Sequence, residues 1–269
     1  MQRHVGPLAK EFMHRGVVTV LQDTNVEDAI KLMDSNYIGS VVVLDSLGPC
    51  GIFSERELVS RVLARGRGPH ETAIAEVASP KFPSINSSAT LEEVAAAMIT
   101  KKSRLMVFED AELVGIVTPT DLMKVLKNVE DDFSILRVIS TRMVTVMPQA
   151  PVDAVVRLMD ENRVGSVLLS ENGRWTGIFT ERDLVRKVLA RRRGLDTAVR
   201  ELATSPIVTA EPGLFGREAA GIMALHGFKR LPLSVRGEGV GIVTARDVVE
   251  AFANATSTRS PRIDWVQWN

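Results

Sequence analysis

The sequence predicts a mixed α/β (α+β) chain built from four copies of one β-α-β-β-α unit. Two observations support this prediction. The phrase Gly, two apolar residues, Ser or Thr, two variable residues, then Asp or Glu occurs as GIFSERE at 51, GIVTPTD at 115, GIFTERD at 177 and GIVTARD at 241. The intervals are 64, 62 and 64 residues, long enough for each copy to form a small supersecondary unit that buries one face against a neighbour.

The four copies alternate between two kinds. GIFSERELVSRVLARGRG at 51–68 returns as GIFTERDLVRKVLARRRG at 177–194, an interval of 126 residues. The second and fourth copies share a Ser-Pro pair at 79 and 205 and basic residues at 104 and 229–230. The order is therefore A-B-A′-B′, which indicates that an ancestral module of two repeats was doubled.

Copy one shows the predicted elements most clearly. In order they are a strand at 17–20, a helix ending at Ser35, strands at 40–44 and 50–53 joined by the turn 45–49, and a second helix starting at Ser54. Thr24 followed by Glu27 has the spacing of a capping box for the first helix. Apolar residues at 26, 29, 30 and 33 give that helix one buried face.

The other copies repeat this order with different helix starts. In copy two, Thr90 and Glu93 form the capping box, and strands are expected at 105–108 and 113–117. Copy three has Pro151 at the expected first helical position, and copy four begins with the weaker signal Pro212-Gly213.

Connectors at 66–71, 128–132 and 192–196 set the expected boundaries. The predicted units are 7–68, 72–128, 133–194 and 197–253, followed by a tail at 254–269. We expect Trp265 and Trp268 in this tail to pack on the domain or on a neighbouring subunit rather than to bind a ligand.

The composition is that of a folded protein, with 45% hydrophobic and 25% charged residues. The 33 basic and 33 acidic residues cancel, so any site for a polyanion must be local. The single Cys50 excludes an intrachain disulfide, and the cysteine and four scattered histidines show no zinc spacing. No signal peptide or membrane span is evident. We therefore expect a cytoplasmic protein with no bound metal and no membrane partner.

The repeated phrase describes a strand that ends where a helix begins. A single such phrase is about equally consistent with a helix cap and with a ligand site. Three copies carry Asp121, Asp183 and Asp247, although capping boxes prefer the longer Glu or Gln. We expect these shorter carboxylates to point outward and to accept hydrogen bonds from a ribose diol. Free N–H groups at the helix start also favour a phosphate, so the four copies indicate a binding module.

Four copies of this phrase, each within a unit of about sixty residues, closely resemble CBS domains, the cystathionine beta-synthase repeat. The resemblance covers Pro7 to Ala253. It implies that repeats pack pairwise through small sheets into two Bateman modules, here 7–128 and 133–253. The organisation is similar to the gamma subunit of AMP-activated protein kinase, an energy sensor whose two modules meet as a flat disc. Clefts in such modules bind AMP, ADP, ATP or S-adenosylmethionine as regulatory ligands, and no cofactor is required.

The resemblance also assigns roles to residues. Asp121, Asp183 and Asp247 would hold ribose hydroxyls, while Thr118, Thr180 and Thr244 would contact ribose or phosphate. Copy one departs from the pattern with Ser54 and Glu57, so its cleft is expected to be vacant or altered. Phosphate contacts are expected from Arg104, Lys229, Arg230, Arg56, Arg182 and Arg246. Adenine is expected between Val20 and Ile38, or between Val146 and Val164.

Other functions have weaker support. The histidines and Cys50 lie in unrelated contexts, so we expect no enzyme activity. Nucleic-acid binding is an alternative because basic residues cluster at 65–67, 101–102 and 191–193, although cations at helix C-termini explain them more simply. A scaffold that binds its partner without a ligand is a third reading. We expect a regulator that transmits adenine-nucleotide occupancy to an unidentified protein partner or effector enzyme; a homodimer is compatible with this.

Overall fold

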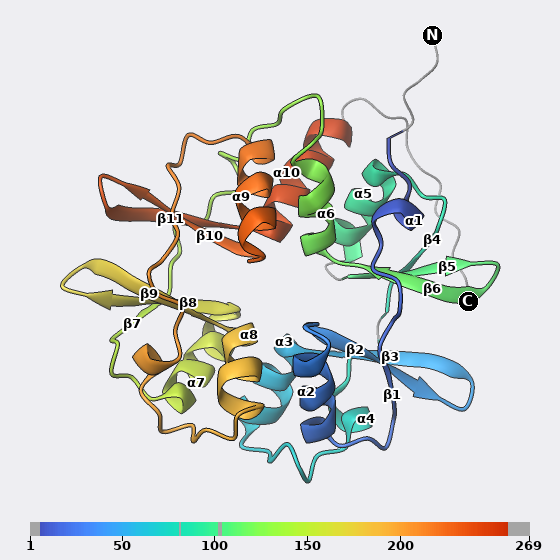
Figure 1. Ribbon diagram of the computed structural model, residues 1–269, viewed down its shortest axis with the longest axis horizontal. Helices are drawn as coiled ribbons and strands as arrows, with labels where there is room; N and C mark the ends of the chain where they lie inside the picture. The colour runs from blue at the N-terminus through green and yellow to red at the C-terminus, as the bar shows by residue number, and fades with distance from the viewer. Residues whose placement is uncertain (1–5, 81, 102–103, 258–269) are drawn as a thin grey trace.

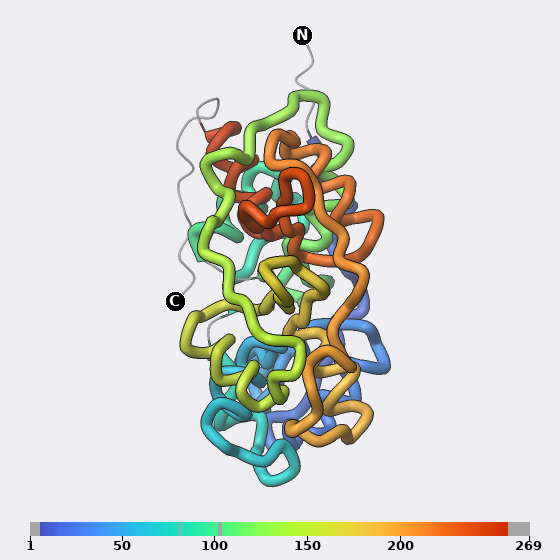
Figure 2. The backbone as a smooth tube through the Cα atoms, turned by 90° about the vertical axis from the view of Figure 1, so that its left-hand side faces the viewer, coloured from blue at the N-terminus to red at the C-terminus, as the bar shows by residue number. Residues whose placement is uncertain are grey.

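The computed structural model describes residues 6–80, 82–101 and 104–257. The four repeats occupy the four quadrants of a flat disc, seen face-on in Figure 1 and edge-on in Figure 2. Repeats one and two form the right side of Figure 1, and repeats three and four form the left side. Trp265 and Trp268 lie outside the described residues.

Repeat one has the predicted order of elements. Its strands are β1 (Thr19–Leu21), β2 (Ser40–Asp45) and β3 (Gly48–Ser54), and its first helix is α2 (Val26–Ser35). Strand β1 runs parallel to β2, and β2 pairs with β3 in the antiparallel direction. The second helix is irregular, since the short α3 (Glu55–Glu57) continues as a π-helix at Leu58–Val62 and a 3-10 turn at Leu63–Arg65.

The remaining repeats keep this plan. Repeat two contains β4 (Ser84–Asn86), α5 (Leu91–Lys101), β5 (Leu105–Glu109), β6 (Glu112–Val117) and α6 (Pro119–Leu126). Repeat three contains β7 (Thr145–Val146), α7 (Val152–Asn162), β8 (Ser166–Glu171), β9 (Arg174–Thr180), α8 (Glu181–Asp183) and a π-helix at Leu184–Leu189. Repeat four contains α9 (Gly216–His226), β10 (Arg230–Val235), β11 (Glu238–Thr244) and α10 (Ala245–Ser257).

Repeat four differs from the prediction at its first strand. In place of a third strand, the structure has one parallel bridge between Ala210 and Leu233. Pro206 and Pro212 flank this segment, and a proline has no N–H to donate to a sheet ladder.

The helix starts were partly predicted. Thr90 and Glu93 form the expected capping box, since the Glu93 carboxylate accepts from the Thr90 N–H at 2.8 Å and the Thr90 hydroxyl accepts from the Glu93 N–H at 3.3 Å. In repeat one the cap is Asn25 instead of Thr24; its Oδ1 accepts from the Asp28 N–H at 2.8 Å. Thr24 is held in the preceding turn, because its N–H donates to the Leu21 carbonyl and its carbonyl accepts from the Ile74 N–H.

The prolines expected at the helix starts of repeats three and four lie before the helices instead. Pro151 is the residue before helix α7 rather than its first residue. In repeat four the helix starts after Phe215, beyond Pro212-Gly213, and the Glu218 carboxylate accepts from the Phe215 N–H at 2.8 Å.

The segment that leads into each repeat packs on the other repeat of its pair. Helix α1 (Ala9–Phe12) precedes repeat one but packs on α6 and β6 of repeat two, and the Ala9 N–H donates to the Ala89 carbonyl at 2.8 Å. Helix α4 (Ile74–Val77) leads into repeat two but lies against β3 of repeat one. Ser140 pairs with Ile242, and Thr204 pairs with Ile178, in the second half of the chain. This exchange ties the repeats into two modules of two.

Helices lie at the contact between the modules. Helix α6 packs against α9 and helix α5 against α10, and repeats two and four share one hydrophobic core. The helices of repeats one and three also face each other (Figure 1), but two separate cores lie beneath them. The strand-to-helix turns that carry the repeated phrase point toward the centre of the disc, where all four repeats meet.

Candidate functional site

The aspartates of the repeated phrase cap their own helices. The N–H of Thr118 donates to Asp121 Oδ2 at 3.0 Å, that of Thr180 to Asp183 Oδ2 at 2.9 Å, and that of Thr244 to Asp247 Oδ2 at 2.7 Å. The aspartates thus do form capping boxes, and only their second carboxylate oxygen is free of the cap. The first helical turn brings the third residue close enough for a short carboxylate to reach back to the cap.

The second carboxylate oxygen of these aspartates has different surroundings in different repeats. Asp183 Oδ1 lies 2.7 Å from Lys187 Nζ and 3.4 Å from the Thr204 hydroxyl, whereas Asp121 Oδ1 lies 3.5 Å from Lys124 Nζ. One oxygen is thus committed to the cap, and the other can exchange its partner for a ligand hydroxyl.

Copy one differs in sequence but keeps the arrangement of copies two and three, in which the Thr118 and Thr180 hydroxyls donate to Asp121 and Asp183. The buried Ser54 hydroxyl donates to the Glu57 carboxylate and accepts from the Arg56 N–H at 3.3 Å. Glu57 therefore folds back on the start of its own helix.

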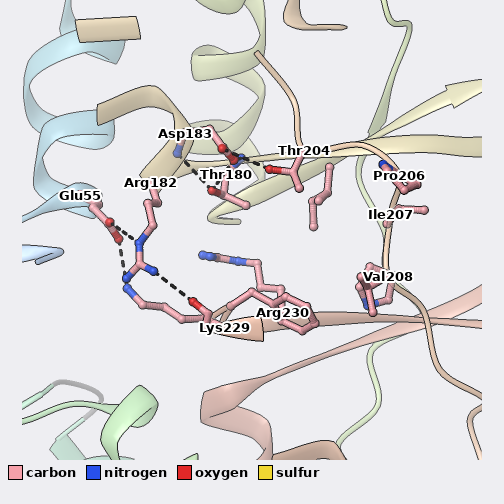
Figure 3. A pocket seen from close by; sticks show the side chains of 14 residues that line it. Glu55, Thr180, Arg182, Asp183, Thr204, Pro206, Ile207, Val208, Lys229 and Arg230 are labelled. Carbon is pink, nitrogen blue, oxygen red and sulfur yellow. Dashed lines mark hydrogen bonds and ion pairs between the residues drawn. The ribbon is translucent and has the colours of Figure 1, made fainter. Parts of the chain in front are cut away.

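Charged side chains from all four repeats converge at the centre of the disc. Glu55 of repeat one lies 3.2 Å from Lys229 Nζ of repeat four and 3.6 Å from Arg182 Nε of repeat three. Arg104 of repeat two donates to the Gly39 carbonyl at 3.2 Å. Figure 3 shows Glu55, Arg182 and Lys229 meeting at one point. Because Glu55 comes from the first module and the two cations from the second, this cluster joins the modules.

Burial and charge act in opposite directions on these groups. Burial alone would raise the pKa of the Glu55 carboxyl, but attraction to Lys229, Arg182 and Arg104 outweighs it and lowers that pKa. Burial lowers the pKa of the Lys229 ammonium, and the attraction of Glu55 opposes this change. Burial likewise lowers the pKa of Arg104. Each charge in the cluster therefore depends on its neighbours for compensation.

A second acidic residue completes the cluster. Glu181 lies 3.1 Å from Arg230, where the guanidinium and the carboxylate crowd the Cα of Gly165; a Cβ at that position would lie 1.8 Å from Arg230. A side chain at position 165 would therefore have to displace the paired Arg230 and Glu181 side chains.

A cavity of about 150 Å³ opens from this cluster between repeats three and four. Figure 3 shows three parts along it: the charged cluster at one end, Thr180 and Asp183 beside the middle, and an apolar segment at the other end. The lining residues are Glu55, Ile178, Thr180, Arg182, Asp183, Thr204, Pro206, Ile207, Val208, Gly227, Phe228, Lys229, Arg230 and Pro232. A largely apolar pocket with a few convergent polar groups is typical of a small-molecule site.

A larger basic groove of about 630 Å³ adjoins the cavity and shares Arg182, Asp183, Thr204 and Gly227 with it. Arg186 and Arg191 in this groove contact Asp34 of repeat one at 3.3 and 3.0 Å. Arg192, next in sequence, lies 3.1 Å from Glu27. Two of the three arginines at 191–193 thus contact the other module.

The structure brings together five of the residues expected to bind ligand: Thr180, Asp183, Arg182, Lys229 and Arg230. The other phrase residues, Thr118, Asp121, Thr244, Asp247, Ser54 and Glu57, lie in their own strand-to-helix turns. Arg104 is in the central cluster, and Arg56 is exposed. Burial lowers the pKa of Arg246 most, and repulsion from the Arg56 guanidinium lowers it further.

The residues expected around adenine do not line the cavity between repeats three and four. Val20 is 6% exposed and belongs to the core of repeat one, so its side chain does not line an open cleft. Ile38, Val146 and Val164 pack against the edges of the cores. The cavity uses Phe228, the repeat-four residue that precedes the strand as Ile38 and Val164 do, together with Ile207 and Val208.

Sequence reasoning missed Glu55 and Thr204. Glu55 stands inside the repeated phrase, but its position is variable among the four copies, so the motif gave it no weight. Thr204 lies near the start of repeat four, well before its copy of the phrase, and no feature of the phrase points to it.

Comparison with known proteins decides the family. Residues 9–64, 74–128, 133–190 and 199–254 each match the model of the CBS domain. This chain belongs to the CBS domain family. A CBS domain-containing protein of Bacillus subtilis is 30% identical over 115 residues, which cover 43% of this chain and 82% of the relative. A 33.4 kDa protein from a ribosomal RNA operon of Thermofilum pendens is 26% identical over 93% of this chain and 90% of its own length.

Solved structures share the arrangement of four CBS repeats. A Methanocaldococcus jannaschii protein, described as a candidate archaeal homologue of g-AMPK, superposes with a TM-score of 0.76 at 18% identity and covers 91% of this chain and 100% of its own. A Pyrococcus horikoshii protein superposes with a TM-score of 0.64 at 20% identity, over 91% and 99% of the two chains. The predicted mixed α/β fold, with CBS repeats paired into Bateman modules, is confirmed. Within the described ranges, no helix combines the length and apolarity required to cross a bilayer.

Proposed function

We propose that this chain is a regulatory protein that binds an adenine nucleotide in the cleft between CBS repeats three and four and signals its occupancy to a protein partner. The observation that carries the proposal is the order of groups along one cavity. Apolar Ile207 and Val208 stand at one end, Asp183 beside the middle, and basic Arg182 and Lys229 at the other end, with the Arg230 guanidinium directed toward them. A nucleotide presents the same order of chemistry: a flat base, a diol and a phosphate.

Each part of the cavity would contact one part of the ligand. The apolar end would pack against adenine, and Asp183 Oδ1 would exchange its bond with Thr204 for a ribose hydroxyl. The Lys229 ammonium and the two guanidinium groups would hold the phosphate through charge-assisted hydrogen bonds.

Transmission would follow from the position of the phosphate end. Lys229 and Arg182 contact Glu55, which belongs to the opposite module. A phosphate that draws these cations away from Glu55 would change the contact between the modules, so a ligand would favour one arrangement of the disc over another. A partner that recognises that arrangement would then sense the ligand.

Calorimetric titration tests the proposal. The protein is freed of bound ligand by unfolding and refolding, then titrated with AMP, ADP, ATP and S-adenosylmethionine. We expect a Kd in the micromolar range or tighter, which corresponds to a favourable binding free energy of about 8 kcal/mol or more. Asp183→Asn, which keeps an oxygen for the cap but removes the charge, should weaken binding about tenfold. Asp153→Asn, at an exposed ion pair with Arg157, is the matched control and should bind as the wild type does.

Absence of binding by all four ligands would reject the proposal and leave the scaffold reading. The nucleic-acid alternative has less support, because Arg191 and Arg192 are engaged with Asp34 and Glu27. Salt-dependent retention on a single-stranded polynucleotide would favour it.

A further inference from the structure

We propose that Glu55, a residue of the first module, sets the ligand preference of the cleft in the second module, so that this cleft takes an adenosine monophosphate in preference to the triphosphate. The inference rests on the function proposed above. The carboxylate lines the cavity from the opposite module and lies against two of the cations expected to hold phosphate.

The charges around the phosphate end decide how much negative charge it accepts. Arg104, Arg182, Lys229 and Arg230 supply four positive charges there, and Glu55, Glu57 and Glu181 supply three negative ones, leaving one in excess. Asp183 also lines the cavity, but Lys187 at 2.7 Å balances it. A monophosphate carries about two negative charges near neutral pH. It therefore comes closer to the positive excess than ADP or ATP, because each added phosphoryl group brings further negative charge.

Glu55 is fixed rather than free to swing aside. Its backbone N–H donates to the Gly39 carbonyl at 3.1 Å, and its side chain is 7% exposed. A Cβ on Gly39 would lie 3.0 Å from the Glu55 carboxyl carbon, so the glycine leaves just enough room for the carboxylate. A further phosphate entering this end would meet a held negative charge in a partly desolvated site, where like charges repel strongly.

The size of the cavity agrees with this inference. Its volume of about 150 Å³ is below the range of roughly 300–1,000 Å³ typical of ligand pockets, so every added group must displace side chains. The smallest phosphate chain needs the least displacement. The positive excess also disfavours the cationic sulfonium of S-adenosylmethionine at this end.

The test compares nucleotide preference in charge variants of the whole chain. AMP and ATP are titrated without magnesium into the wild type, Glu55→Gln and Glu76→Gln, a control at an exposed ion pair with Arg67. We expect the wild type and the control to bind AMP at least about tenfold more tightly than ATP. In Glu55→Gln the ratio should fall about tenfold, mainly through tighter ATP binding.

A second variant covers the case in which loss of the carboxylate unfolds the protein. Glu55→Gln combined with Lys229→Gln restores the original charge excess, and it should return the AMP to ATP ratio to within about threefold of the wild-type value. A folded Glu55→Gln protein with an unchanged ratio would overturn the inference, as would a double variant that keeps the ratio of the single one. A wild type that binds ATP as tightly as AMP would also overturn it. Failure of every nucleotide to bind would instead reject the proposed function.

Discussion

The two contacts between the modules are built differently from repeats that share one plan of strands and helices. Between repeats two and four, helices α5, α6, α9 and α10 enclose one continuous apolar core. Between repeats one and three, two cores remain separate and exchange a few residues. Buried Val59 of repeat one enters the core of repeat three, and Val185 of repeat three enters that of repeat one. Partly buried residues add to each exchange, Leu63 and Ala64 on one side and Leu189 and Ala190 on the other.

Ion pairs take the place of a shared core between repeats one and three. Asp34 contacts Arg186 and Arg191, Glu27 contacts Arg192, and Asp160 contacts Arg65. Tyr37 adds a cation–π contact, with the Arg186 guanidinium 4.5 Å from its ring centroid. Apolar burial contributes most of the stability of an interface, whereas exposed ion pairs contribute little and weaken with salt. We therefore expect the contact between repeats two and four to stay closed, and the contact between repeats one and three to rearrange more easily.

The largest predicted effect breaks the shared core. Leu122→Ala in α6 should lower the free energy of unfolding by about 2–5 kcal/mol, because it leaves a cavity among fully buried side chains. Leu184→Ala, at the equivalent position of repeat three, should cost a similar amount. Hydrogen exchange distinguishes them: Leu122→Ala should increase exchange in α9 and α10 of the other module, whereas Leu184→Ala should act mainly within repeat three. Equal spread in both variants would contradict the comparison.

A smaller effect is expected where the linker between the modules meets the shared core. The Phe133 ring packs edge-on against Phe252, and a Cβ on Gly216 would lie 2.0 Å from it. Gly216→Ala should therefore displace the ring and lower the free energy of unfolding by about 1–3 kcal/mol in a thermal or urea denaturation. Gly213→Ala, where nothing lies within 4 Å of an added Cβ, is the control. Equal stability of the two variants would show that Phe133 does not anchor the linker.

The contact between repeats one and three should respond to charge and salt. Asp34→Asn removes both ion pairs of Asp34 and should lower the free energy of unfolding by at most about 1 kcal/mol at low salt, and by less at high salt. Asp160→Asn, which loses only the contact with Arg65 at 3.5 Å, should have a smaller effect. A loss that persists unchanged at high salt would argue that packing, and not charge, holds this contact.

The smallest effect concerns the Asp247 carboxylate in helix α10, which contributes to the core that repeats two and four share. Burial raises the pKa of Asp247, although the Thr244 N–H and hydroxyl oppose the change. A raised pKa in the folded protein means that ionised Asp247 destabilises the fold above that pKa, and that the penalty disappears as the pH falls through it. Asp247→Asn should thus be slightly more stable than the wild type at neutral pH, by less than about 1 kcal/mol, with the difference vanishing in acid. Urea denaturation at several pH values measures it, and a less stable variant at neutral pH would contradict the sign.

Much of the fold follows from the sequence because the repeated phrase marks a fixed junction of strand and helix. The strands at 40–44 and 105–108 and the cap at Thr90 lie where the pattern placed them. The cap at Asn25 could not be chosen over Thr24, because both residue types cap helices and only the contact of Thr24 with Ile74 decides between them. The missing first strand of repeat four depends on two prolines whose effect the pattern of apolar residues does not record.

The candidate site was harder to predict for a related reason. Asp183 and Arg182 could be named from the phrase, which repeats their setting in several copies, and Arg230 from the resemblance to CBS domains. Glu55 could not, because it reaches the cavity from a segment 126 residues away from the repeat-three phrase. Contacts between modules depend on how the modules meet, and a pattern within one repeat contains no information on that meeting.

The unequal partners of two equivalent glutamates have a consequence for how such a chain evolves. Glu55 and Glu181 stand 126 residues apart at the same place in the phrase, yet Glu55 contacts Lys229 of the opposite module and Glu181 contacts Arg230 of its own. Two identical chains related by a two-fold axis would carry every substitution in both halves. A single chain can change one half alone. Position 229 is lysine, for example, whereas the equivalent position of the second repeat, 103, is serine. Covalent linkage thus allows the two halves of one disc to diverge in the contacts they make at its centre.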